Sequence, residues 1–139
     1  MEVYSYSNKD LTSSSKSIVL VRMVDDMSDK TMAIVVSGVQ SVVYMELIGI
    51  QAAMALAPMG LQYISLSASK TTAEYLDISD DGKWVKEPKN NIDLIEKIRS
   101  EFANFGSFSI KRMGPKVASK MKIASNPYVR ELNHILAEA

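Results

Sequence analysis

The residues best suited to chemistry form a basic segment near the carboxyl terminus. Between Gly106 and Arg130 the chain carries six cationic side chains and no acidic one. They are Lys111, Arg112, Lys116, Lys120, Lys122 and Arg130. Clustered lysine and arginine bind phosphate groups through charge and charge-assisted hydrogen bonds. Because their spacing is irregular, a solvated loop is the alternative interpretation of this segment.

Other kinds of chemistry have little support. The 139 residues contain no cysteine, which excludes disulfides, thiolate zinc fingers and thiol catalysis. His134 is the only histidine, and a lone histidine on a terminal helix is usually structural or solvent-facing. Lysine plus arginine and aspartate plus glutamate both number 16, so the overall charge indicates no partner. We expect neither a cofactor nor a bound metal.

The composition is that of one soluble globular domain spanning residues 1–139. Hydrophobic residues make up 47% of the chain and charged residues 23%. The longest apolar run, from Leu47 to Met59, is too short to cross a bilayer. The first residues lack the basic and apolar regions of a signal peptide, so we expect a cytoplasmic location.

The hydrophobic periodicity changes along the chain from that of strands to that of helices. The expected elements are strands at 3–6, 18–24 and 32–36, a helix at 43–54, a strand at 63–66, helices at 71–77 and 91–105, a strand at 108–112 and a helix at 130–139. A polar connection is expected at 114–127. Three consecutive strands followed by alternating helices and strands predict an α/β domain with a mixed sheet, antiparallel first and parallel later.

This order of elements resembles that of ribonuclease HI and its relatives, and local motifs agree in the same order. The similar segments are Tyr44-Met45-Glu46-Leu47 opening the first long helix, Ser67-Ala68-Ser69 after a strand, Gly82-Lys83-Trp84-Val85 in a loop, Asn91-Ile92-Asp93-Leu94 at a helix start and Leu136-Ala137 near the end. The ordered series carries the resemblance. It implies an RNase H-like fold, with a five-stranded mixed sheet flanked by helices.

The resemblance also indicates what the chain lacks. RNase H-type nucleases hydrolyse phosphodiesters with two divalent cations held by about four carboxylates. The family's four acid positions correspond to Tyr6, Glu46, Ala68 and His134, or to Ala137 for the last if the register slips by three. Only Glu46 is acidic, and residues 114–127 contain no counterpart of the family's loop histidine. We therefore expect a catalytically degenerate domain and not an enzyme.

The retained residues allow alternative interpretations. Glu46 is either a remnant of a metal site or an ordinary helix glutamate, and the loss of its partners favours the second. Glu46 and His134 would give a single metal only two protein ligands, which bind weakly. Tyr6 replaces an acid and could fill the old site with its ring. Lys83 and Trp84 occupy the loop where family members carry a substrate-binding handle, or Trp84 covers the core.

Degenerate domains of this family occur in retroelements and pararetroviruses. The sequence is similar in this respect to the central region of the caulimovirus translational transactivator, or viroplasmin. We therefore expect a non-catalytic module that binds double-stranded RNA or an RNA–DNA hybrid, protein partners such as translation or replication factors, or both, in viral translation or replication assembly. The alternatives are a tether (connection) domain of a reverse transcriptase, a pure interaction scaffold that self-associates, and residual metal-dependent hydrolysis.

Overall fold

The computed structural model describes residues 1–9, 15–58 and 60–138, without the side chains of residues 135–138. Its strands are β1 (Glu2–Asn8), β2 (Lys16–Val24), β3 (Asp29–Ser37), β4 (Tyr63–Ala68) and β5 (Ser107–Arg112). They form one sheet in the order β3-β2-β1-β4-β5. The pairs β1–β2 and β2–β3 are antiparallel, whereas β1–β4 and β4–β5 are parallel. The predicted five-stranded mixed sheet is therefore confirmed.

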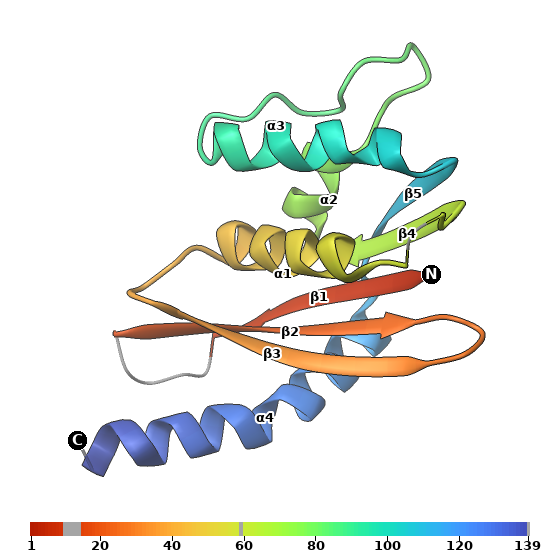
Figure 1. Cartoon of the computed structure of the whole chain (residues 1–139). Helices are drawn as coiled ribbons and strands as arrows, with labels where there is room; N and C mark the ends of the chain where they lie inside the picture. The colour runs from red at the N-terminus through yellow and green to blue at the C-terminus, as the bar shows by residue number, and fades with distance from the viewer. Residues whose placement is uncertain (10–14, 59, 139) are drawn as a thin grey trace.

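Helices cover both faces of this sheet (Figure 1). They are α1 (Val42–Leu56), α2 (Lys70–Leu76), α3 (Ile92–Glu101) with a following 3-10 turn (Phe102–Asn104), and α4 (Pro115–Glu138). The first three lie on one face, and α4 crosses the other beneath β1 and β2. Among the described residues, no helix is long and apolar enough to cross a membrane.

The larger core lies between the sheet and α1. Leu47 and Ile50 of α1 pack in one cluster with Val19 and Val21 of β2, and all four are completely buried. A Cβ on Gly49 would lie 2.5 Å from Ser5 Oγ and 2.7 Å from Val21 Cγ2, well inside van der Waals contact. Glycine at this position therefore lets the backbone of α1 approach β1 and β2 closely.

A smaller core fixes α4 to the opposite face. Leu20 packs in a cluster with Met113 and Met121, and Tyr6 borders that cluster. At the end of β1, the Nδ2 of the buried Asn8 donates to Ser125 Oγ over 2.6 Å and to Asn126 Oδ1 over 3.1 Å. These contacts position α4 against the carboxyl end of β1.

The structure corrects the sequence prediction for this last helix. Residues 115–127 are helical, so α4 begins at Pro115 and not at Arg130, and the expected polar connection does not form. Proline suits the first helical position because its missing N–H needs no partner there. Met121, Ser125 and Val129, spaced four residues apart, form the buried stripe. Lys122, directly after Met121, and the internal Pro127 masked that period in the sequence.

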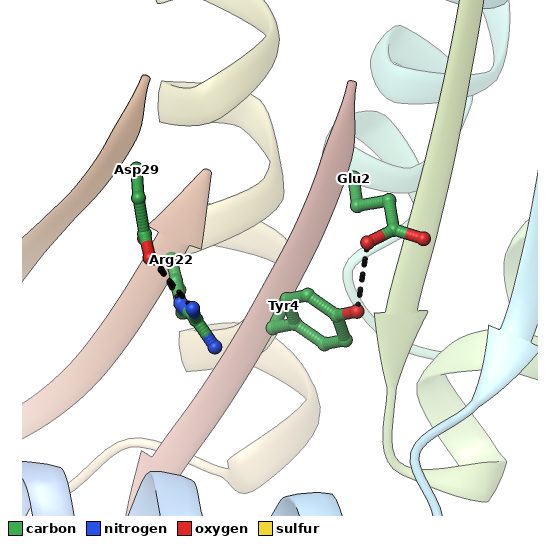
Figure 2. A network of polar contacts seen from close by, with 4 residues as sticks. All are labelled: Glu2, Tyr4, Arg22 and Asp29. Atoms are coloured by element: carbon green, nitrogen blue, oxygen red, sulfur yellow. Dashed lines mark hydrogen bonds and ion pairs between the residues drawn. The ribbon is translucent and has the colours of Figure 1, made fainter. Parts of the chain in front are cut away.

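An exposed ion pair joins β2 to β3 close to the turn between them (Figure 2). Arg22 donates to both carboxylate oxygens of Asp29, over 3.0 and 2.6 Å. Beside it on β1, Tyr4 Oη donates to Glu2 Oε2 over 3.1 Å. The ion pair adds little stability because both of its side chains are about half exposed.

Candidate nucleic-acid interface

A cleft of about 450 Å³ opens where the carboxyl ends of the parallel strands meet. Its walls come from the end of β1, the first turns of α1 and α2, the end of β5 and the first half of α4. In open α/β sheets this edge is where ligands are usually bound. The volume lies within the range of small-ligand sites, roughly 300–1,000 Å³. The cleft is therefore the natural place to examine the predicted site residues.

Glu46 lies in the wall of this cleft and is only 2% exposed. Its Oε1 accepts hydrogen bonds from Ser69 Oγ at 2.5 Å and from Thr72 Oγ1 at 2.8 Å. Its Oε2 accepts one from the backbone N–H of Ser69 at 3.1 Å. Ser69 is the residue that precedes α2, so the carboxyl group ties α1 to the start of α2. Glu46 is thus a structural residue with both oxygens hydrogen-bonded.

The environment of Glu46 shifts its protonation. Burial raises the pKa of the carboxyl group above its ordinary value of 4.5. Hydrogen bonds from Ser69 and Thr72, and the positive charge of Lys9, oppose this shift without cancelling it. Desolvation thus outweighs hydrogen bonding at this carboxyl.

This shift predicts a pH-dependent stability. Because the folded-state pKa of Glu46 is raised, the stabilisation from its neutral form is complete below the unfolded pKa and is lost as the pH rises through the folded pKa. We expect urea unfolding from about pH 4 to pH 8 to show the Glu46→Gln variant gaining stability relative to the wild type as the pH rises. A difference that stays constant over this range would contradict the assignment.

Cationic side chains dominate the remaining polar lining of the cleft. Lys9 follows β1, Lys70 opens α2, Arg112 ends β5 and Lys122 lies in the second turn of α4. All four are exposed. The Nζ of Lys70 also lies 3.9 Å from Oε1 of Glu74, one turn further along α2. Among the described residues that line the cleft, Glu46 is the only one with a carboxyl group. The cleft therefore presents positive charge.

The four positions that correspond to the family's acids separate in the structure. Tyr6 and Glu46 both line the cleft. Ala68 is 2% exposed at the end of β4, where its carbonyl oxygen accepts from the Met113 N–H over 2.6 Å, and it does not line the cleft. His134 is exposed on α4, about 18 Å along the helix beyond Lys122 at 1.5 Å per residue. The structure therefore does not bring Glu46 and His134 together.

The six cations of the basic segment divide into two groups. Arg112 and Lys122 line the cleft, whereas the others are exposed outside it: Lys111, Lys116, Lys120 and Arg130. Lys116 and Lys120 lie one turn apart, on the side of α4 opposite its buried stripe. Sequence reasoning missed Lys9 and Lys70, since each stands apart from the basic segment. The sequence indicated them only by their position, because each lies just after a strand, β1 or β4, whose carboxyl end lies at the cleft.

The residues of the cleft do not fit a two-metal centre. Such a centre needs about four carboxylates to hold its two divalent cations. The described residues of the cleft offer only the carboxyl group of Glu46, and its oxygens already accept hydrogen bonds from Ser69 and Thr72. In the part of the chain that the structure describes, no group of three or more histidine, cysteine, aspartate or glutamate residues could hold a metal ion.

Trp84 lies outside the cleft and covers the core. The guanidinium carbon of Arg99 lies 4.2 Å from the centre of its ring. Arg99 Nε donates to the carbonyl of Tyr75 over 2.9 Å, and its Nη2 donates to that of Lys86 over 2.8 Å. Burial lowers the pKa of this arginine, and the charges of Glu87 and Glu96 oppose that shift. Of the two alternatives for Trp84, the structure thus favours core cover, held by α3.

Several solved structures share this fold, among them two RNase H proteins. RNase H1 from the archaeon Halobacterium salinarum matches with a TM-score of 0.55 and 19% identity, over 86% of this chain and 90% of its own. The N-terminal RNase H domain of a Mycobacterium tuberculosis protein matches with a TM-score of 0.51 and 11% identity, over 91% and 97%. The sequence matches no known protein-family model and no curated protein. The similarity establishes an RNase H-like fold.

Proposed function

We propose that this chain is a non-catalytic RNase H-like module that binds the backbone of double-stranded RNA or of an RNA–DNA hybrid. The observation that carries the proposal is the charge of the cleft. Lys9, Arg112 and Lys122 line the sheet edge where a metal-dependent nuclease of this fold would need acids. Both solved structures of the same fold are RNase H proteins, which supports nucleic acid as the partner of this chain.

The basic surface extends beyond the cleft. Lys111 and Arg112 are adjacent at the end of β5, and the exposed side of α4 adds Lys116, Lys120 and Arg130. Contacts of this kind follow phosphates and recognise the shape of a duplex without selecting a base sequence. The proposal is therefore for backbone binding with little sequence preference.

Salt-dependent binding is the first expected result. In a gel shift on a duplex of about 20 base pairs, the logarithm of the association constant should fall linearly with the logarithm of the salt concentration. Replacing three cations together, Lys116→Glu, Lys120→Glu and Lys122→Glu, should weaken binding by about tenfold or more, because three attractions become repulsions.

The matched control changes the same number of charges elsewhere. The exposed residues Lys30, Lys89 and Lys97 lie on β3, before α3 and on α3, away from the cleft. Their replacement by glutamate should weaken binding by about threefold or less, through the net charge alone. If the wild-type protein gives no shift at low salt, the proposed function is wrong.

The biological setting follows from the family resemblance. We propose a role in the translation transactivation or replication assembly of a retroelement or pararetrovirus, with the tether domain of a reverse transcriptase as the alternative. The reading frame around this segment separates these two settings. A flanking polymerase would indicate a tether, and a zinc knuckle or low-complexity flank would indicate a transactivator.

A protein-interaction scaffold is the second candidate function. The observation that favours it is the position of β3 at the edge of the sheet, since edge strands pair readily with other chains. Light scattering tests self-association directly. A molecular mass that rises with protein concentration would favour this function, and a constant monomer mass would exclude self-association as its means.

A further inference from the structure

We propose that the cleft at the carboxyl ends of β1, β4 and β5 seats a phosphate group directly on its cationic side chains, without an intervening divalent metal. This inference rests on the proposed function and names the group that the cleft recognises. In a metal-dependent nuclease of this fold, acidic side chains bind metal ions and the metal ions bind the phosphate. Here cationic side chains would bind the phosphate directly.

The first support is that the cations come from separate parts of the chain. Lys9 lies after β1, Lys70 at the start of α2, Arg112 at the end of β5 and Lys122 on α4, yet all four line one cleft. Four exposed cations along one helix would be ordinary surface charge. Convergence from four elements requires the fold, and it surrounds a volume large enough for a phosphate and part of its sugar.

The second support is the chemistry of these side chains. Arg112 offers a planar guanidinium that can donate two parallel hydrogen bonds to one phosphate. Lys9 and Lys70 offer ammonium groups that can donate to the remaining oxygens. Ammonium and guanidinium groups favour phosphate over a divalent cation, which they would repel.

The third support is that Glu46 does not oppose a phosphate strongly. The carboxyl group is buried in the cleft wall, and its oxygens face the donors of Ser69 and Thr72. Burial raises the pKa of this carboxyl group and so disfavours its charged form, and this effect outweighs the opposing effects of its hydrogen bonds and of the charge of Lys9. Glu46 therefore builds the wall of the cleft without acting as a metal ligand.

Two triple variants test the inference, because each removes three positive charges from exposed residues. The cleft variant carries Lys9→Gln, Lys70→Gln and Arg112→Gln. The matched outer variant carries Lys116→Gln, Lys120→Gln and Arg130→Gln, all on α4 outside the cleft. If a phosphate sits in the cleft, the cleft variant should bind a duplex at least fivefold more weakly than the outer variant at the same ionic strength. Circular dichroism melting verifies that both variants fold.

Two further measurements define what the cleft holds. Binding in EDTA should equal binding in Mg²⁺ at matched ionic strength. Duplexes with 5′-phosphate and 5′-hydroxyl ends should bind equally if a backbone phosphate is seated. The phosphorylated duplex should bind at least threefold more tightly if a terminal phosphate is seated. Tighter binding of the phosphorylated duplex supports a terminal seat, whereas after equal binding the two triple variants decide whether a backbone phosphate is seated.

The inference would be overturned by equal weakening in the two variants, or by duplex binding that needs Mg²⁺. Its failure is distinct from failure of the proposed function, because in both of those cases the wild-type protein still binds the duplex. If the wild-type protein binds no duplex, titration with inorganic phosphate decides. Backbone amide shifts at Ser69, Lys70 and Met113 that are absent from the cleft variant support the seat, and no shift overturns it.

Discussion

Replacing Glu46 with alanine is expected to lower the free energy of unfolding by about 2–4 kcal/mol. The truncation removes the acceptor for the Ser69 N–H and for the hydroxyls of Ser69 and Thr72. Leaving a buried donor without a partner costs about 1–3 kcal/mol. The truncation would also leave a cavity, because the Glu46 side chain is only 2% exposed. Removal of the carboxyl group also removes the cost of burying it, and this gain offsets part of the loss.

Glutamine is the matched control at this position. Its amide oxygen can accept from the Ser69 N–H, and its amide nitrogen can donate to the hydroxyls of Ser69 and Thr72, which also act as acceptors. We therefore expect the Glu46→Gln variant to lose less than about 1 kcal/mol at neutral pH. Urea unfolding measures both variants. Equal losses for alanine and glutamine would contradict the view that hydrogen bonding to α2 is what Glu46 supplies.

The second large effect is expected at Gly49. A Cβ there would lie 2.5 Å from Ser5 Oγ, 2.7 Å from Val21 Cγ2 and 3.2 Å from Val19 Cγ2. These neighbours are completely buried, so they cannot move aside without disturbing the larger core. We expect Gly49→Ala to cost about 3 kcal/mol, which overrides the gain in helix propensity of about 1 kcal/mol. In a domain of this size that loss lowers the melting temperature by roughly 10 °C.

Gly114 provides the control for Gly49. A Cβ on Gly114 would meet nothing within 4 Å, so the same substitution there should cost less than about 1 kcal/mol. The double variant Gly49→Ala with Val21→Ala should lose less than the sum of the single variants, because the smaller neighbour removes one close contact. Full additivity would show that α1 moves away from the sheet as a whole.

The sequence predicted the order and type of the elements up to β5 because most of them carry a clear local signal. Strand β2 is strongly β-branched, and Leu47, Ile50 and Met54 mark one face of α1. The first half of α4 was predicted wrongly, because its buried stripe includes a serine and is interrupted by Lys122 and Pro127. Ser125 is completely buried, yet no rule of composition assigns a serine to a core. Its partner Asn8 is more than a hundred residues away in the chain.

The site was predictable in part. Tyr6, Glu46, Arg112 and Lys122 were identified from the resemblance or the charge pattern, and all four line one cleft. Lys9 and Lys70 were missed, since an isolated lysine carries no signal until the fold places it beside others. His134 was aligned with the family's last acid position on the final helix. Because α4 begins earlier than predicted, Ala118 and Lys122 of this helix line the cleft and His134 does not. Only tertiary structure supplies that register.

The central claim is that this RNase H-like fold binds a duplex without cutting it. The most direct test incubates the protein with an end-labelled RNA–DNA hybrid and Mn²⁺, and measures binding and cleavage in the same reaction. We predict that the hybrid is bound and remains intact. Cleavage that depends on Mn²⁺ and is abolished by Glu46→Gln would contradict the claim.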